Sequence, residues 1–144
     1  MPQTIAAAGH DRQLIVQPDV VDLRDRYYAP ALMALPQEVK PKAGYLEIRD
    51  QGQESACTGF ALASVIDRQC KQLAQSPHAD PVSTRMLYEM ARLHDDLPDE
   101  AQAGSTLRGA LKGFFHNGVC READAPFLVA PGAPDFSLTF DLAE

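Results

Sequence analysis

The 144-residue sequence contains no tryptophan, and aromatic residues make up only 7% of it. It also lacks any apolar run near the roughly 18–20 residues of a membrane-spanning helix, so no contact with a membrane is expected. Basic residues are scarce: 13 lysines and arginines stand against 20 acidic residues, for a formal charge of −7. This balance argues against binding to nucleic acid. The 45% share of hydrophobic residues is typical of a globular protein of one domain.

Cysteine and histidine are few and scattered along the chain. The cysteines are Cys57, Cys70 and Cys120, and the histidines are His10, His78, His94 and His116. An odd number of cysteines without a C-x-x-C pair predicts neither a disulfide framework nor a metal site, and no cofactor is expected. The first 14 residues lack the basic and apolar regions of a secretory signal. Together these features predict a cytoplasmic protein.

Residues 1–42 are predicted to be an N-terminal extension, and residues 43–144 to be the main domain. Pro30, Pro36 and Pro41 exclude a long helix between residues 31 and 42, because proline cannot continue a helix and restricts the residue before it. We expect an extended segment that packs over the main domain, with one helical turn at residues 31–35.

Two helices are predicted in the first part of the main domain. The first begins near Ser55–Cys57 and runs to about Leu73, since apolar or small residues recur there with a 3.6-residue period. Its stripe consists of Cys57, Phe60, Ala61, Ser64 and Val65. The second begins after Ser83, a residue type that caps helix N-termini. Its predicted buried face consists of Met86, Leu87, Met90 and Ala91.

A third helix is predicted from Ser105 or Thr106 to Asn117, before Gly118 as a C-terminal cap. Its predicted core stripe consists of Leu107, Ala110, Leu111, Phe114 and Phe115. The acidic residues 95–100 before it are interpreted as a solvated turn rather than a calcium site. Near the C-terminus, the alternation of Phe136, Leu138 and Phe140 predicts a half-buried strand.

The clearest candidate catalytic residues lie where a polar, glycine-containing loop leads into the first helix. Cys57 falls in the first turn, where unpaired N–H groups and the helix dipole stabilise a thiolate and make it a nucleophile. Gln51, six residues earlier, carries a carboxamide that can donate a hydrogen bond toward the same point. Together with the backbone N–H of Cys57, it would form a two-donor oxyanion hole. The competing interpretation is that Cys57, like Cys70 and Cys120, is a small buried hydrophobic residue.

This segment resembles the start of a papain-like cysteine peptidase. In that family a Gln-Gly loop precedes the catalytic cysteine by six residues, as Gln51-Gly52 precedes Cys57 here. Three further segments resemble the family: 82–88 its L-S-x-Q-x-L helix start, 104–120 its G-G…A-L…Y-G-I segment, and 122–127 its E…Y-P-Y segment. The resemblance implies an α+β papain-like proteinase fold, represented mainly by its helical subdomain with three helices and little strand. It also implies Cys57 as nucleophile and Gln51 in the oxyanion hole.

The chain departs from the family pattern next to the nucleophile. The usual Cys-Gly-Ser-Cys-Trp is replaced by Glu54-Ser55-Ala56-Cys57-Thr58. The first cysteine of that motif forms a disulfide in secreted members, and Glu54 stands in its place, which agrees with a reducing compartment. Thr58 replaces the aromatic residue that follows the nucleophile, and this leaves the peptide preference open.

The catalytic histidine and asparagine of the family lie about 130–150 residues after the cysteine, whereas 87 residues follow Cys57 here. The resemblance therefore implies that residues 43–144 are the N-terminal half of a peptidase domain whose base lies beyond residue 144. The four histidines of the chain are interpreted as surface or capping residues.

Two functions remain open. The first is a cysteine peptidase acting on a peptide or protein substrate. The second is a non-catalytic helical module that binds or scaffolds. In either case the face that normally meets the strand-rich half should be exposed and apolar, so that half or a self-associating copy is an expected partner.

Overall fold

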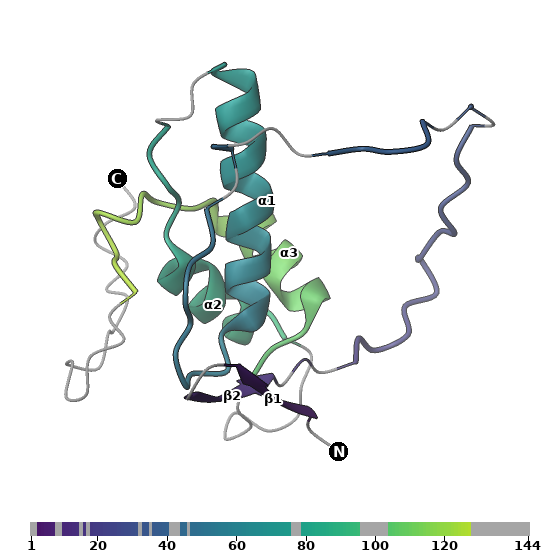
Figure 1. Cartoon of the computed structure of the whole chain (residues 1–144). Helices are drawn as coiled ribbons and strands as arrows, with labels where there is room; N and C mark the ends of the chain where they lie inside the picture. The colour runs from purple at the N-terminus through teal and green to yellow at the C-terminus, as the bar shows by residue number, and fades with distance from the viewer. Residues whose placement is uncertain are drawn as a thin grey trace.

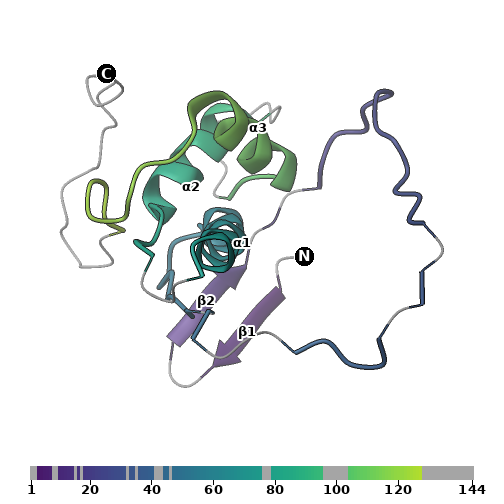
Figure 2. The same cartoon turned by 90° about the horizontal axis from the view of Figure 1, so that it is seen from above.

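The computed structural model describes residues 3–7, 10–14, 16, 18–31, 33–34, 36–40, 44–45, 47–75, 79–95 and 104–127. The described elements are β1 (Gln3–Ala7), β2 (His10–Leu14), α1 (Cys57–Leu73), α2 (Thr84–Leu93) and α3 (Leu107–Asn117). The long helix α1 stands at the centre of Figure 1. Seen down α1, α2 and α3 lie on one side of it and the strands on the other (Figure 2). None of the described helices is long and apolar enough to cross a membrane.

The three predicted helices are confirmed, and their ends follow from local chemistry. Ser83 caps α2 by accepting a hydrogen bond from the backbone N–H of Met86 at 3.0 Å. Thr106 caps α3 in the same way, through the N–H of Gly109 at 2.8 Å. Gly118 ends α3 with a φ of 67°, a backbone conformation that side chains other than glycine rarely adopt.

The helices approach one another closely through glycines. A Cβ placed on Gly59 of α1 would lie 2.9 Å from Tyr88 of α2, and one placed on Gly113 of α3 would lie 2.8 Å from the backbone of Met90. The buried apolar residues are accordingly mostly small: Ala56, Ala63, Leu87, Tyr88, Met90, Ala91, Ala110 and Ala125. The predicted buried face of α2 is confirmed for Leu87, Met90 and Ala91, while Met86 is half-buried.

The predicted core stripe of α3 is confirmed for Ala110 and is wrong for Leu107, Leu111 and Phe115, while Phe114 is half-buried. Leu107, Leu111 and Phe115 are exposed by 51%, 58% and 83%, while the buried residues of this helix are Gly109, Ala110 and Gly113. The physical reason is the close contact with α2, which only a face without large side chains can make. The large apolar residues therefore lie on an open surface, which we call the α3 face (Leu107, Leu111 and Phe115).

The periodic stripe of α1 does not form the core. Phe60 and Cys57 are half-buried, and Ala61, Ser64 and Val65 are exposed. The buried residues of α1 are Thr58, Gly59, Ala63, Asp67 and Lys71. The three polar ones are tolerated because each has a partner: Ser105 for Thr58, Arg49 for Asp67 and Glu47 for Lys71.

The N-terminal extension differs from its prediction. β1 and β2 form an antiparallel hairpin in which Gln3 pairs with Leu14 and Ala7 with His10. Neither strand shows the alternation of apolar and polar residues that reveals a strand in sequence. Asp19 and Asp25 contact the start of α3, while the described residues between 26 and 40 run away from the helices instead of packing over them (Figures 1 and 2). Residues 31, 33 and 34 are not helical. The predicted strand at 136–140, the acidic residues 96–100 and His78 lie outside the described residues.

Backbone and side-chain hydrogen bonds join the N-terminal extension to the start of α3. Val16 forms a parallel bridge with Ser105, and Asp19 accepts a hydrogen bond from the N–H of Arg108 at 3.0 Å. The Arg108 guanidinium donates two hydrogen bonds to the Asp25 carboxylate at 2.9 and 2.6 Å. These bonds hold the pKa of Asp25 below its ordinary value of 3.8.

We expect this fastening to weaken in acid. Because the folded pKa of Asp25 is depressed, its stabilising contribution is complete above pH 3.8 and is lost as the pH falls through the lower folded value. A carbon-detected NMR titration of the Asp25 carboxyl should give a midpoint below 3.8, and Arg108→Gln should return it toward 3.8. Equal midpoints in the two proteins would show that the ion pair does not form in solution.

Candidate active site

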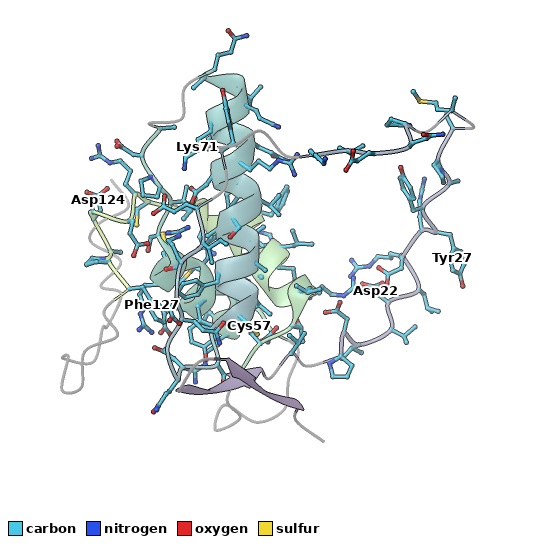
Figure 3. All side chains as sticks on the ribbon, in the orientation of Figure 1. Asp22, Tyr27, Cys57, Lys71, Asp124 and Phe127 are labelled. Carbon is cyan, nitrogen blue, oxygen red and sulfur yellow. The ribbon has the colours of Figure 1, made fainter. Side chains whose placement is uncertain are left out.

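Cys57 is the first residue of α1, as the sequence predicts (Figure 3). Ala56 is the N-cap residue and has no side chain that could bond to the first turn. The backbone N–H groups of that turn point their partial positive charge toward the start of the helix. The Cys57 thiol is half-buried and is not part of a disulfide.

Gln51 lies on a loop that folds back on itself before the helix. Its side-chain nitrogen Nε2 donates a hydrogen bond to the backbone carbonyl of Glu54 at 2.8 Å. The N–H of Gly52 donates to the Asp50 carboxylate at 2.9 Å, and Gly52 has a φ of 62°. The glycine after Gln51 is thus required by the turn itself. The turn holds the Gln51 carboxamide on the loop that leads directly into Cys57.

Glu54 ties this loop to α2. Its carboxylate accepts hydrogen bonds from both terminal nitrogens of Arg85, at 2.6 and 2.8 Å, and Glu89 accepts a third at 3.2 Å. Burial opposes the charge on Arg85, but the hydrogen bonds and charges of Glu54 and then Glu89 outweigh it and raise the pKa of Arg85. The family resemblance places Glu54 where secreted members have a disulfide cysteine. In this chain an ion pair links the loop to the neighbouring helix.

Two aromatic rings complete this side of the site. The Arg85 guanidinium lies over the ring of Phe127, 4.3 Å from its centroid. Phe127 meets Phe60 of α1 edge to face, with ring centroids 4.8 Å apart. The backbone N–H of Phe127 donates to the Glu122 carboxylate at 2.7 Å, which anchors the backbone that carries the ring. Figure 3 labels Phe127 and Cys57 near the same end of α1, with Lys71 at the other end.

Arg49 anchors the segment that leads into the Gln51 loop. Its guanidinium bonds to Asp67 of α1 at 2.8 Å, to Glu122 at 3.2 Å and to the carbonyl of Val82 at 2.9 Å. Asp67 also accepts from the N–H of Val82 at 2.8 Å, and Glu122 from the N–H of Thr84 at 3.0 Å. One arginine therefore joins the loop, the middle of α1 and the start of α2. Sequence reasoning included Glu122 in the resemblance but missed Arg49 and Asp67.

The other side of the site is formed by the start of α3. The hydroxyls of Thr58 and Ser105 share a short hydrogen bond, and both residues are buried. Thr58 follows Cys57 directly, so the bond joins the first turn of α1 to the residues just before α3. The same Ser105 pairs with Val16 of the N-terminal extension, which therefore passes close to this region.

Cys70, Cys120, His94 and His116 are the other cysteines and histidines whose side chains the structure describes. Cys70 is exposed in the last turns of α1, and the N–H of the half-buried Cys120 donates to the Met86 sulfur at 3.2 Å. His94 is the C-cap residue of α2 and stacks on His116 in the last turn of α3, at 5.3 Å between ring centroids. Within the described part of the chain, no group of three or more histidine, cysteine or acidic side chains is arranged to hold a metal ion.

Comparisons with known proteins give one line of support. Neither the family models nor the curated proteins yield a match. Among solved structures, the chain is similar to xylellain, a cysteine protease from Xylella fastidiosa, with a TM-score of 0.69 and 25% sequence identity. The similarity covers 91% of this chain and 49% of xylellain, so the chain spans about half the length of that structure. It supports a papain-like fold, and the three helices agree with the predicted helical subdomain.

Proposed function

We propose that residues 43–144 form the nucleophile-bearing part of a papain-like cysteine peptidase acting on peptide or protein substrates. The observation that carries the proposal is the position of Cys57 at the start of α1, directly after the loop that holds Gln51. The structural similarity to a cysteine protease supports it at the level of the fold.

In the proposed reaction the Cys57 thiolate attacks the carbonyl carbon of a peptide bond. A sulfur–carbon bond forms, and the electron pair of the carbonyl double bond moves onto its oxygen. The Gln51 carboxamide and the Cys57 N–H donate hydrogen bonds to that oxyanion. When the oxyanion collapses, the carbon–nitrogen bond breaks and the amine leaves with a proton. Water then hydrolyses the thioester, which releases the acid and restores the thiol.

The proton for the leaving amine comes from a histidine in the papain family, as the resemblance implies. We propose that this histidine lies outside residues 1–144, because the family resemblance places it about 130–150 residues after the cysteine. Of the described histidines, His94 is the C-cap residue of α2 and His116 lies in the last turn of α3. The 144-residue chain alone should then hydrolyse peptides only at background level. A non-catalytic binding module would show the same lack of turnover, so a test must address the thiol itself.

We expect Cys57 to be the most reactive thiol of the folded chain. A helix N-terminus stabilises a nearby negative charge by about 0.3–1 kcal/mol, or about 2 kcal/mol when the charge is partly buried, and so favours the Cys57 thiolate. Alkylation by iodoacetamide, followed over pH by peptide mapping, should therefore show Cys57 reacting about three- to tenfold faster than Cys70 at neutral pH.

The matched variants are Cys57→Ser and Cys70→Ser. The first should remove the fast phase, and the second should leave it intact, because Cys70 is exposed far along the same helix. In denaturant the thiols should react alike. If Cys57 reacts no faster than Cys70 in the folded chain, the site does not activate its thiol and the binding-module interpretation is favoured.

A further inference from the structure

We propose that the Glu54–Arg85 ion pair is a positioning device for Gln51, an inference that rests on the function proposed above. The contacts form a continuous path. The Gln51 Nε2 donates to the backbone carbonyl of Glu54 at 2.8 Å, and the carboxylate of the same Glu54 receives two hydrogen bonds from Arg85. Arg85 thereby fixes the residue whose carbonyl sets the direction of the Gln51 carboxamide.

The Glu54–Arg85 pair is rigid because Arg85 makes further contacts with α2 and with an aromatic ring. The Arg85 side chain is only 12% exposed, lies on α2, and is also bound by Glu89 at 3.2 Å. The Phe127 ring covers its guanidinium at 4.3 Å. A bidentate arginine–carboxylate pair fixes the relative orientation of the two side chains as well as their distance. Glu54 is therefore tied to a helix, although it lies on a loop.

The orientation of Gln51 matters for the proposed chemistry. A carboxamide nitrogen carries two N–H groups, and a bond from one of them to the Glu54 carbonyl fixes the plane in which the other lies. Stabilisation of an oxyanion depends on donors that are already in place when the charge develops. Arg85 and Glu54 touch no reacting atom in this scheme and act through Gln51 alone.

The probe that tests this is N-acetyl-L-phenylalaninal, labelled with carbon-13 at the aldehyde. The Cys57 sulfur adds to the aldehyde carbon, and the thiol proton ends on the oxygen to give a hemithioacetal, so no leaving group and no histidine are needed. The adduct is measured by carbon NMR on the 144-residue chain. Iodoacetamide alkylation is measured in parallel, because displacement of iodide leaves no oxygen on the attacked carbon for the Gln51 carboxamide to bind.

We expect Arg85→Met and Glu54→Gln each to weaken the adduct by about tenfold, less than the roughly 100-fold or more that loss of a direct donor can cost. The double variant should be no weaker than either single one, because both break the same path. Alkylation of Cys57 should stay within about twofold of the unmodified protein, since the helix N-terminus is unchanged. The matched control is Arg92→Met, which removes an arginine of the same helix that pairs with Glu89.

A second readout does not depend on the thiol. The side-chain amide protons of Gln51 should be protected from exchange in the unmodified protein and lose that protection in Glu54→Gln. This variant also covers the case in which Arg85→Met fails to fold, because Glu54 is the more exposed partner, at 38%.

The outcomes separate the two proposals. An adduct that forms equally well in all variants, or unchanged protection of Gln51 in Glu54→Gln, overturns the positioning role and leaves the peptidase proposal standing. Equal losses in alkylation and in adduct would also overturn it, because they would show general loosening of the site. If the unmodified chain forms no adduct and alkylates Cys57 no faster than Cys70, the proposed function itself fails.

Discussion

Replacing Arg49 by methionine should lower the free energy of unfolding by about 3–5 kcal/mol. The side chain of Arg49 is only 15% exposed and pairs with Asp67, which is 6% exposed, and with Glu122. Methionine keeps most of the side-chain volume but leaves a buried carboxylate without its partner. Because Arg49 also donates to the carbonyl of Val82, the start of α2 loses an anchor at the same time.

The measurement is denaturant unfolding followed by circular dichroism. Arg121→Met is the matched control, because Arg121 also forms ion pairs, with Asp124 and Asp80, but is 65% exposed. It should leave the free energy of unfolding almost unchanged. Similar losses in the two variants would mean that the Arg49 contacts stabilise the protein no more than ordinary surface pairs.

The sequence predicts the helices well because their signals are local. Ser83 and Gly118 mark helix ends through bonds and backbone angles that involve only their own neighbours. The position of Cys57 at the start of α1 is predicted for the same reason. The family resemblance is carried by ordered short motifs, and the similarity to xylellain supports the fold that it implied.

The sequence does not predict which face of a helix is buried when small residues make the contact. On α3 the large apolar residues repeat with a helical period, but they are exposed. The interior faces of α1 and α3 consist of glycines, alanines and partnered polar residues. Periodicity of hydrophobicity assumes that large apolar residues go inside. That assumption fails where two helices pack at glycines.

Local sequence patterns also do not predict the ion pairs that join distant residues in the site. Glu54 and Arg85 are separated by 31 positions, and Arg49 and Glu122 by 73. Nothing near Glu54 in sequence indicates that it pairs with α2 instead of facing solvent. Only the fold brings these charges together, so the support of the Gln51 loop could not be inferred before the helices were placed.

Enlarging Gly113 and shortening Leu111, two residues of α3, should change the free energy of unfolding in the opposite way to that expected from their hydrophobicity. Gly113→Leu should destabilise the protein by about 3 kcal/mol or more, since overpacking of a filled contact typically costs 1–3 kcal/mol and a Cβ alone would lie 2.8 Å from the Met90 backbone. Leucine is a better helix former than glycine by about 1 kcal/mol or slightly less, so helix propensity cannot cause the loss of stability.

Leu111→Ala is the matched change in the other direction, because Leu111 belongs to the α3 face and is 58% exposed. It should cost less than about 1 kcal/mol, compared with 2–5 kcal/mol for a leucine in a true core. Both variants are measured by denaturant unfolding at one low protein concentration, so that any association through the α3 face does not contribute. A large loss for Leu111→Ala together with a small one for Gly113→Leu would mean that α3 is rotated about its axis, with its leucines inside. The open α3 face would then not exist, and its residues would form the core that their periodicity predicts.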